Sequence, residues 1–134
     1  MTVVPVTLAT AAAAVGVNTW LGARISGLRR DLKVSVGDGG HELLLRRMRT
    51  QANFIENAPL FLILLGGLEL SGGNRWGLGV LALVFIVGRI AHGYGMDGGS
   101  LQPRRRDGMI SSTFALFVLA LWALFCAGEA LLGG

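Results

Sequence analysis

Four long apolar segments alternate with short polar segments along the chain. Residues 1–23 and residues 108–128 contain no charged side chain. Each run is long enough to cross a bilayer as a helix, since about 20 apolar residues span the hydrocarbon core. Two further apolar stretches, interrupted by a few charges, lie between them. The pattern predicts four membrane-spanning helices, at residues 3–30, 41–70, 75–96 and 108–132.

Three polar segments separate the predicted helices and are expected to face water. They are residues 31–40 (DLKVSVGDGG), 71–74 (SGGN) and 97–107 (DGGSLQPRRRD). Their glycines and charges favour turns, and irregular backbone is not stable in contact with lipid. The predicted fold class is therefore an all-α integral membrane protein, an antiparallel bundle of four transmembrane helices with both termini on one side.

The composition agrees with one membrane domain over residues 1–134. Hydrophobic residues make up 52% of the chain and charged residues only 15%, against roughly 25% charged residues in soluble domains. This argues against a water-soluble monomer and excludes a disordered chain. The single cysteine, Cys126, excludes an internal disulfide. A cleaved signal peptide is the alternative interpretation of the first segment. However, the apolar run of this segment is too long for a signal peptide and is not preceded by basic residues.

The basic residues are concentrated at two of the predicted loops. Arg75 alone marks the opposite face. The positive-inside rule then places the first and third loops in the cytoplasm and both termini outside. Topology thereby explains the formal charge of +4, and no nucleic acid is expected as a partner. The residues that flank these two loops are Arg24, Arg29, Arg30, Lys33, Arg46, Arg47, Arg49, Arg104, Arg105 and Arg106.

Several polar side chains lie within the predicted second and third helices. Arg49, Asn53 and Glu56 are spaced to share one helix face, and so are Arg89 and His92. Ionisable residues inside a membrane are functional candidates by default. Glu56 and Arg89 lie about 9 Å and about 10 Å from the cytoplasmic surface, at a rise of about 1.5 Å per residue. We therefore predict an ion pair between them, either as a structural contact or as part of a site, with Asn53 satisfying further donors.

The arginines near the cytoplasmic surface outnumber the acidic residues of the same segments. Two interpretations are open for Arg46, Arg49 and the run from Arg104 to Arg106. They either contact acidic lipid headgroups or bind an anionic ligand. Arg47 is expected to contact headgroups only.

Three motifs occur in order along the chain. They are RxQxNxxExxPLFL at residues 49–62, GRxxH at residues 88–92 and RRxGM at residues 105–109. With these motifs, residues 36–109 resemble the MAPEG family, the membrane-associated proteins of eicosanoid and glutathione metabolism. The family includes microsomal glutathione transferases and the leukotriene and prostaglandin synthases that use glutathione. The loop GDGG at residues 37–40 is typical of its small bacterial branch.

The resemblance implies a homotrimer of four-helix subunits in a bacterial inner membrane. It also implies that glutathione, as co-substrate, binds in a polar pocket between neighbouring subunits near the cytoplasmic side. The family's residues that contact glutathione from the second and third helices correspond to Arg49, Asn53, Glu56 and Arg89.

Further site residues follow from the same resemblance. His92 corresponds to a histidine that the prostaglandin synthase has three residues after the third-helix arginine. The arginine held near the thiol corresponds to Arg105, which is the expected catalytic residue. Arg104 and Arg106 are one step away, so the register leaves them as alternatives for that role or as further ligands of glutathione.

Two positions depart from the family's pattern. Met96 and Asn57 stand where some members have tyrosines that contact glutathione. The only tyrosine, Tyr94, lies about 140° around the helix from Arg89 at about 100° per residue, and packing or an interfacial position is expected for it. The resemblance therefore supports glutathione binding better than catalysis.

The expected chemistry uses the thiol of glutathione as the nucleophile. Such a thiol, with a pKa of about 8.5, is mostly protonated at neutral pH, and a neighbouring guanidinium lowers that pKa by favouring the thiolate. The thiolate would attack a lipophilic electrophile or a hydroperoxide that arrives through the membrane lipids. Conjugation and peroxide reduction are both open. No metal is expected, because His41 and His92 lack the further ligands of a zinc site.

Proteins without enzymatic activity form the alternative class. A membrane scaffold or a lipid-binding protein is consistent with the composition. A small four-helix transporter is disfavoured, because the first predicted helix carries no acidic residue and the polar residues cluster toward one side of the membrane.

Overall fold

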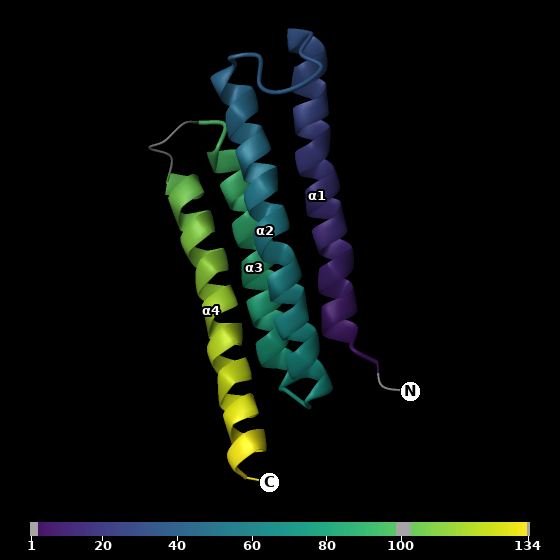
Figure 1. Cartoon of the computed structure of the whole chain (residues 1–134), viewed down its shortest axis with the longest axis vertical. Helices are drawn as coiled ribbons and strands as arrows, with labels where there is room; N and C mark the ends of the chain where they lie inside the picture. Colours follow the sequence, from purple (N-terminus) through teal and green to yellow (C-terminus); the bar gives the residue numbers. More distant parts are fainter. Residues whose placement is uncertain (1–2, 99–102, 134) are drawn as a thin grey trace.

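Four helices make up most of this computed structural model, which describes residues 3–98 and 103–133. Their bounds are Pro5–Leu32 (α1), Glu42–Leu70 (α2), Arg75–Gly95 (α3) and Pro103–Leu132 (α4). The helices run alternately up and down, so the two ends of the chain lie at the same end of the bundle (Figure 1). All four are long and apolar enough to cross a membrane. The predicted four-helix fold is confirmed.

The fourth helix begins earlier than its apolar run. The polarity of residues 97–107 predicts a loop there, whereas α4 begins at Pro103. Proline suits the first position of a helix, because its φ angle is preset and its missing N–H would have no helical partner. The three arginines that follow therefore belong to the first turns of α4. Successive helical residues point about 100° apart, so these arginines face three directions.

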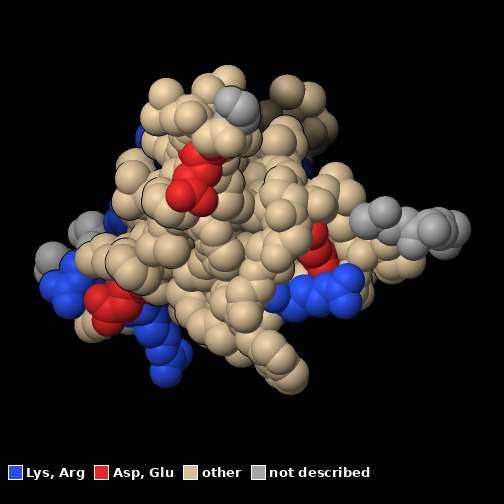
Figure 2. Space-filling view, turned by 90° about the horizontal axis from the view of Figure 1, so that it is seen from below, with Lys and Arg blue, Asp and Glu red and all other residues tan. Residues whose placement is uncertain are grey.

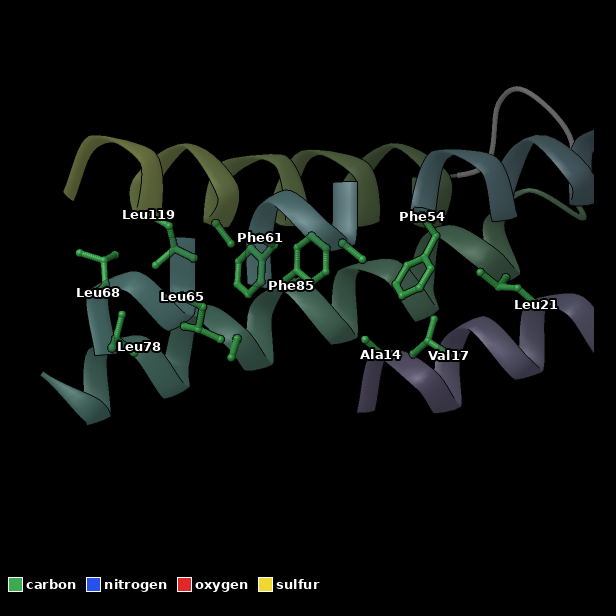
Figure 3. Packing of buried hydrophobic residues seen from close by; sticks show 13 residues of the cluster. Ala14, Val17, Leu21, Phe54, Phe61, Leu65, Leu68, Leu78, Phe85 and Leu119 are labelled. Atoms are coloured by element: carbon green, nitrogen blue, oxygen red, sulfur yellow. The ribbon is translucent and has the colours of Figure 1, made fainter. Parts of the chain in front are cut away.

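The interior of the bundle is apolar and draws on all four helices (Figure 3). Phe61 of α2 and Phe85 of α3 stack with their ring centroids 4.1 Å apart. Val17 of α1 and Leu119 of α4 belong to the same cluster. Surrounding lipid would be as apolar as this core, so side-chain packing, rather than removal from water, holds membrane helices together. Close packing and internal polar contacts then fix how the helices are arranged.

The helices α3 and α4 approach closely at glycines. A methyl group on Gly108 would lie 2.5 Å from the carbonyl oxygen of Gly88 and 2.6 Å from the backbone nitrogen of His92. A methyl group on Gly95 would overlap the backbone of Arg105. Small residues at such contacts let helix backbones approach closely in lipid. This crossing brings His92 of α3 next to Arg105 of α4.

An ionic cluster joins α1 and α2 to the segment after α3. The carboxylate of Asp97 accepts hydrogen bonds from Nε (3.0 Å) and Nη2 (2.9 Å) of Arg47, and it also pairs with Arg24. The Arg24 guanidinium lies 4.7 Å from the ring centroid of Trp20 and 5.6 Å from that of Tyr94. The prediction that Arg47 contacts only headgroups is wrong, because its side chain turns toward Asp97 between the helices.

The surroundings of Asp97 favour its ionised form. Burial alone would raise the pKa of this carboxyl, but the hydrogen bonds from Arg47 and the charge of Arg24 outweigh burial, and the pKa is lowered. The ionised carboxylate therefore ties the C-terminal end of α3 to α1 and α2.

Polar contacts also join α1 to α2 along the rest of the bundle. The side-chain amide of Gln51 donates to Asn18 over 3.1 Å. Near the chain termini, the Glu69 carboxylate accepts from the backbone nitrogens of Val6 (3.0 Å) and Thr7 (2.8 Å) and so caps the start of α1. Viewed from that end, the surface is mostly uncharged (Figure 2). The arginine-rich end is the opposite one.

Candidate functional site

A polar cavity of about 240 Å³ lies between α2, α3 and α4. Its lining residues belong to the first halves of α2 and α4 and to the C-terminal end of α3. These parts of the helices lie at the end of the bundle opposite the chain termini (Figure 1). A larger hollow of about 530 Å³ between α3 and α4 is lined mainly by apolar side chains. The smaller cavity is therefore the place where charged groups gather. Its lining residues are Arg49, Ala52, Asn53, Glu56, His92, Met96, Arg105 and Met109.

One face of α2 forms the first wall of this cavity. Arg49, Asn53 and Glu56, which share a stripe by their spacing, all line it. Arg49 and Glu56 are exposed, and Asn53 is half-buried. This wall is therefore open toward the outside of the chain.

Arg89 lies behind the cavity wall, with only 3% of its surface exposed. Its Nη1 donates a hydrogen bond to the side-chain oxygen of Asn53, and its guanidinium lies 5.2 Å from the ring centroid of Phe85. In residues 3–98 and 103–133, Arg89 forms no ion pair, and its buried Nε has no hydrogen-bond partner. A positive charge therefore stands beside the cavity without a carboxylate to balance it.

The predicted ion pair between Glu56 and Arg89 is wrong. The two residues are level in depth, but Asn53 and Glu56 are three positions apart and so point about 60° apart around α2 at about 100° per residue. Asn53 is the one that faces Arg89. Glu56 instead lines the cavity, and within residues 3–98 and 103–133 its carboxylate forms no ion pair.

His92 and Arg105 form the wall opposite α2. His92 is 5% exposed, and its Nδ1 lies 3.0 Å from the backbone carbonyl oxygen of Arg105. The Arg105 side chain is half-buried and lines the same cavity. The close crossing of α3 and α4 thus brings the imidazole ring against the backbone of Arg105, whose side chain lines the same cavity as His92.

The three consecutive arginines lie in three different surroundings. Arg105 lines the polar cavity. Arg104 is exposed and lines the apolar hollow between α3 and α4. Arg106 is exposed and its Nε lies 3.1 Å from the carboxylate of Asp107. Of the three candidates left open by the register, Arg105 is the one that the structure brings to the cavity.

The aromatic residue at this end of α3 faces away from the cavity. The ring of Tyr94 packs against Trp20 of α1, with the centroids 4.9 Å apart. Met96 is buried and lines the cavity. Asn57 donates to the backbone carbonyl of Asn53 over 2.7 Å. Among the described residues, the wall of the cavity thus holds no tyrosine.

Two polar contacts near the site are hard to predict from the sequence. Asp97 lies in a glycine-rich segment that resembles an ordinary loop, yet it joins Arg24 to Arg47. Gln51 lies inside the RxQxN motif, and its bond to Asn18 fixes α2 against α1. Both contacts hold the helices that carry the cavity wall.

Comparisons with known proteins agree with this geometry. The model of the MAPEG family matches residues 7–125, a region that reaches into all four helices and contains every residue lining the cavity. Inner membrane protein YecN, from two strains of Escherichia coli, is 32% identical over 94 residues, which cover 70% of this chain and 71% of YecN. That name states a location in the inner membrane. This chain belongs to the MAPEG family.

Proposed function

We propose that this protein is a membrane enzyme that binds glutathione and activates its thiol, as a glutathione transferase or peroxidase. The observation that carries the proposal is the cavity itself. It gathers Arg49, Asn53 and Glu56 of α2 with His92 of α3 and Arg105 of α4. Membership of the MAPEG family, which includes glutathione transferases, supports the same ligand.

The chemistry of the cavity suits glutathione. The tripeptide has two carboxylates, an ammonium group and a thiol. Guanidinium groups bind carboxylates through paired donors, so Arg49 and Arg105 are fitted to the negative groups and Glu56 to the ammonium. The unbalanced charge of Arg89 lies directly behind Asn53 and adds to the attraction for an anion.

Arg105 is the group that would activate the thiol. Its positive charge favours the thiolate and so lowers the pKa of the thiol of glutathione. In a conjugation, the sulfur forms a bond to an electrophilic carbon. In a peroxide reduction, the thiolate attacks the hydroperoxide and a second glutathione reduces the resulting sulfenic acid. The family match leaves both reactions open.

A neighbouring subunit would complete the cavity. Arg49 and Glu56 are exposed in the single chain, so the α2 wall has room for a second protomer, and a homotrimer would bury it. We place the protein in the bacterial inner membrane with the cavity toward the cytoplasm and both termini outside. Lipophilic electrophiles would then reach the cavity laterally from the lipid.

Calorimetry with the protein purified in detergent tests this proposal. Wild type should bind glutathione saturably at millimolar or lower concentration, and Arg49→Ala should bind it at least about tenfold more weakly, since a hydrogen bond to a charged group contributes about 1.5–3 kcal/mol. Arg106→Ala is the matched control, because Arg106 is exposed and pairs with Asp107. Wild type that does not bind glutathione would favour a scaffold or a lipid-binding protein instead.

A further inference from the structure

The hydrogen bond of His92 fixes which ring nitrogen carries a proton. Nδ1 lies 3.0 Å from the carbonyl oxygen of Arg105, and a carbonyl oxygen only accepts hydrogen bonds. Nδ1 is therefore protonated and donates to this bond. In the neutral ring, Nε2 is then the proton acceptor. Within residues 3–98 and 103–133, no group forms a hydrogen bond with Nε2.

The His92 ring, with its unbonded Nε2, belongs to the wall of the polar cavity. His92 is almost fully buried where it lines this cavity. The charged groups around the ring are Arg89 on its own helix, Arg105 on α4, and Arg49 and Glu56 on α2. A thiol bound among these groups has to lose a proton before its sulfur can react, and Nε2 is the neutral acceptor in this wall.

We propose that His92 is a second catalytic residue, the base that takes the thiol proton of glutathione. This inference rests on the proposed function, because it requires glutathione in the cavity. The S–H bond breaks and the proton moves to Nε2, which leaves a thiolate beside an imidazolium. With an aryl halide, the sulfur then bonds to the ring carbon and the halide leaves. The imidazolium finally releases its proton to solvent.

Arg105 supports both partners of this proton transfer. Its backbone carbonyl holds the imidazole in the tautomer with Nε2 free, and its guanidinium stabilises the sulfur anion that forms. The crossing of α3 and α4 keeps these groups together. The two helices lie so close there that a side chain at Gly108 would overlap the backbone of His92. A histidine with only a structural role would need the Nδ1 bond alone, so a test has to separate the two nitrogens.

Two substitutions make this separation. His92→Asn places an amide nitrogen near the position of Nδ1, so a donor to the Arg105 carbonyl remains while the base is removed. His92→Gln places an amide near the position of Nε2 and loses that bond. His41→Asn is the matched control, because His41 is exposed and its side chain makes no capping bond at the start of α2.

Each full-length protein is purified in detergent and measured in two ways. Glutathione affinity is determined by calorimetry, and kcat/KM is determined with chlorodinitrobenzene from about pH 6 to above the ordinary thiol pKa of about 8.5. We expect His92→Asn to bind glutathione about as tightly as wild type does and to lose on the order of 100-fold in kcat/KM near neutral pH. The loss should shrink as the pH rises toward the ordinary thiol pKa of about 8.5, because solvent then deprotonates the thiol without a base. His41→Asn should match wild type at every pH.

Other outcomes would overturn the inference. A loss of the same size at every pH would show that His92 only supports the structure, and wild-type rates in His92→Asn would show that no base is needed. If His92→Asn does not fold, His92→Gln replaces it, and recovery of its rate at high pH again supports the base. Wild type that fails to bind glutathione would overturn the proposed function itself, so the two failures are distinguishable.

Discussion

The buried charge of Arg89 is held by an amide and an aromatic ring. Its hydrogen bond to Asn53 and its contact with Phe85 replace only part of the hydration that a guanidinium has in water. Depth along a helix can be predicted from the sequence, because the rise per residue is constant, and it placed Glu56 level with Arg89. The rotation of α2 could not be predicted, since it is set by packing against three other helices, and that rotation turns Asn53 toward Arg89.

Asn53→Ala should therefore destabilise the protein more than Glu56→Gln does. Loss of a hydrogen bond to a charged group costs about 1.5–3 kcal/mol, and here it leaves Arg89 buried without its acceptor. Glu56 is exposed and forms no ion pair within the described part of the chain, so Glu56→Gln should change the free energy of unfolding by less than about 0.5 kcal/mol. Unfolding in detergent measures both variants, and the reverse order would contradict this arrangement.

Asp97→Asn should lower stability at neutral pH and lose that effect in acid. The pKa of Asp97 is lowered in the folded protein, so its ion pairs contribute fully above the ordinary pKa of about 3.9. That contribution is lost as the pH falls through the lower folded value. Melting temperatures of wild type and variant should thus converge below about pH 4. A gap that is the same at all pH values, or an equal effect of Asp31→Asn at an exposed position, would count against this role.

At the scale of the helices, the close crossing of α3 and α4 forms the cavity wall that carries His92 and Arg105. The four apolar runs were sufficient to predict the helices, because a bilayer requires a fixed length of apolar helix. The start of α4 was not predictable in the same way. Positive charges in the first turn interact unfavourably with the helix dipole, but Pro103 favours the start of a helix and outweighs that effect. The family resemblance favours Arg105 and leaves Arg104 and Arg106 open, and the helical register of residues 103–108 shows that Arg105 reaches the cavity.

Gly95→Ala should separate these helices and disturb the cavity. Its methyl group would overlap the backbone of Arg105, and overpacking of this kind costs about 1–3 kcal/mol. Glutathione should bind more weakly, because Arg105 and His92 move apart. Gly128→Ala is the matched control, since open space surrounds that position in α4, and alanine there should be neutral or stabilise by up to about 1 kcal/mol. Equal melting temperatures for the two variants would contradict a tight crossing.

At the scale of the whole molecule, the outer surface is apolar along most of the bundle. The helices α1 and α4 lie on opposite sides (Figure 1), and α4 exposes several large apolar side chains. Lipid and a neighbouring subunit both accept such a surface, so composition cannot distinguish the two, and a trimer could not be predicted from the spacing. The exposed Arg49 and Glu56 are the features that favour a subunit at the α2 wall.

Ionisation of bound glutathione tests the role of the cavity most directly. A thiolate absorbs in the ultraviolet where a thiol does not, so titration of the detergent-purified protein with glutathione reports the thiolate. We predict a saturable thiolate signal at neutral pH for wild type and for Arg106→Ala, and loss of that signal in Arg105→Ala. A wild type that gives no saturable signal, or an Arg105→Ala variant that gives the wild-type signal, would contradict the assignment of this cavity to glutathione activation.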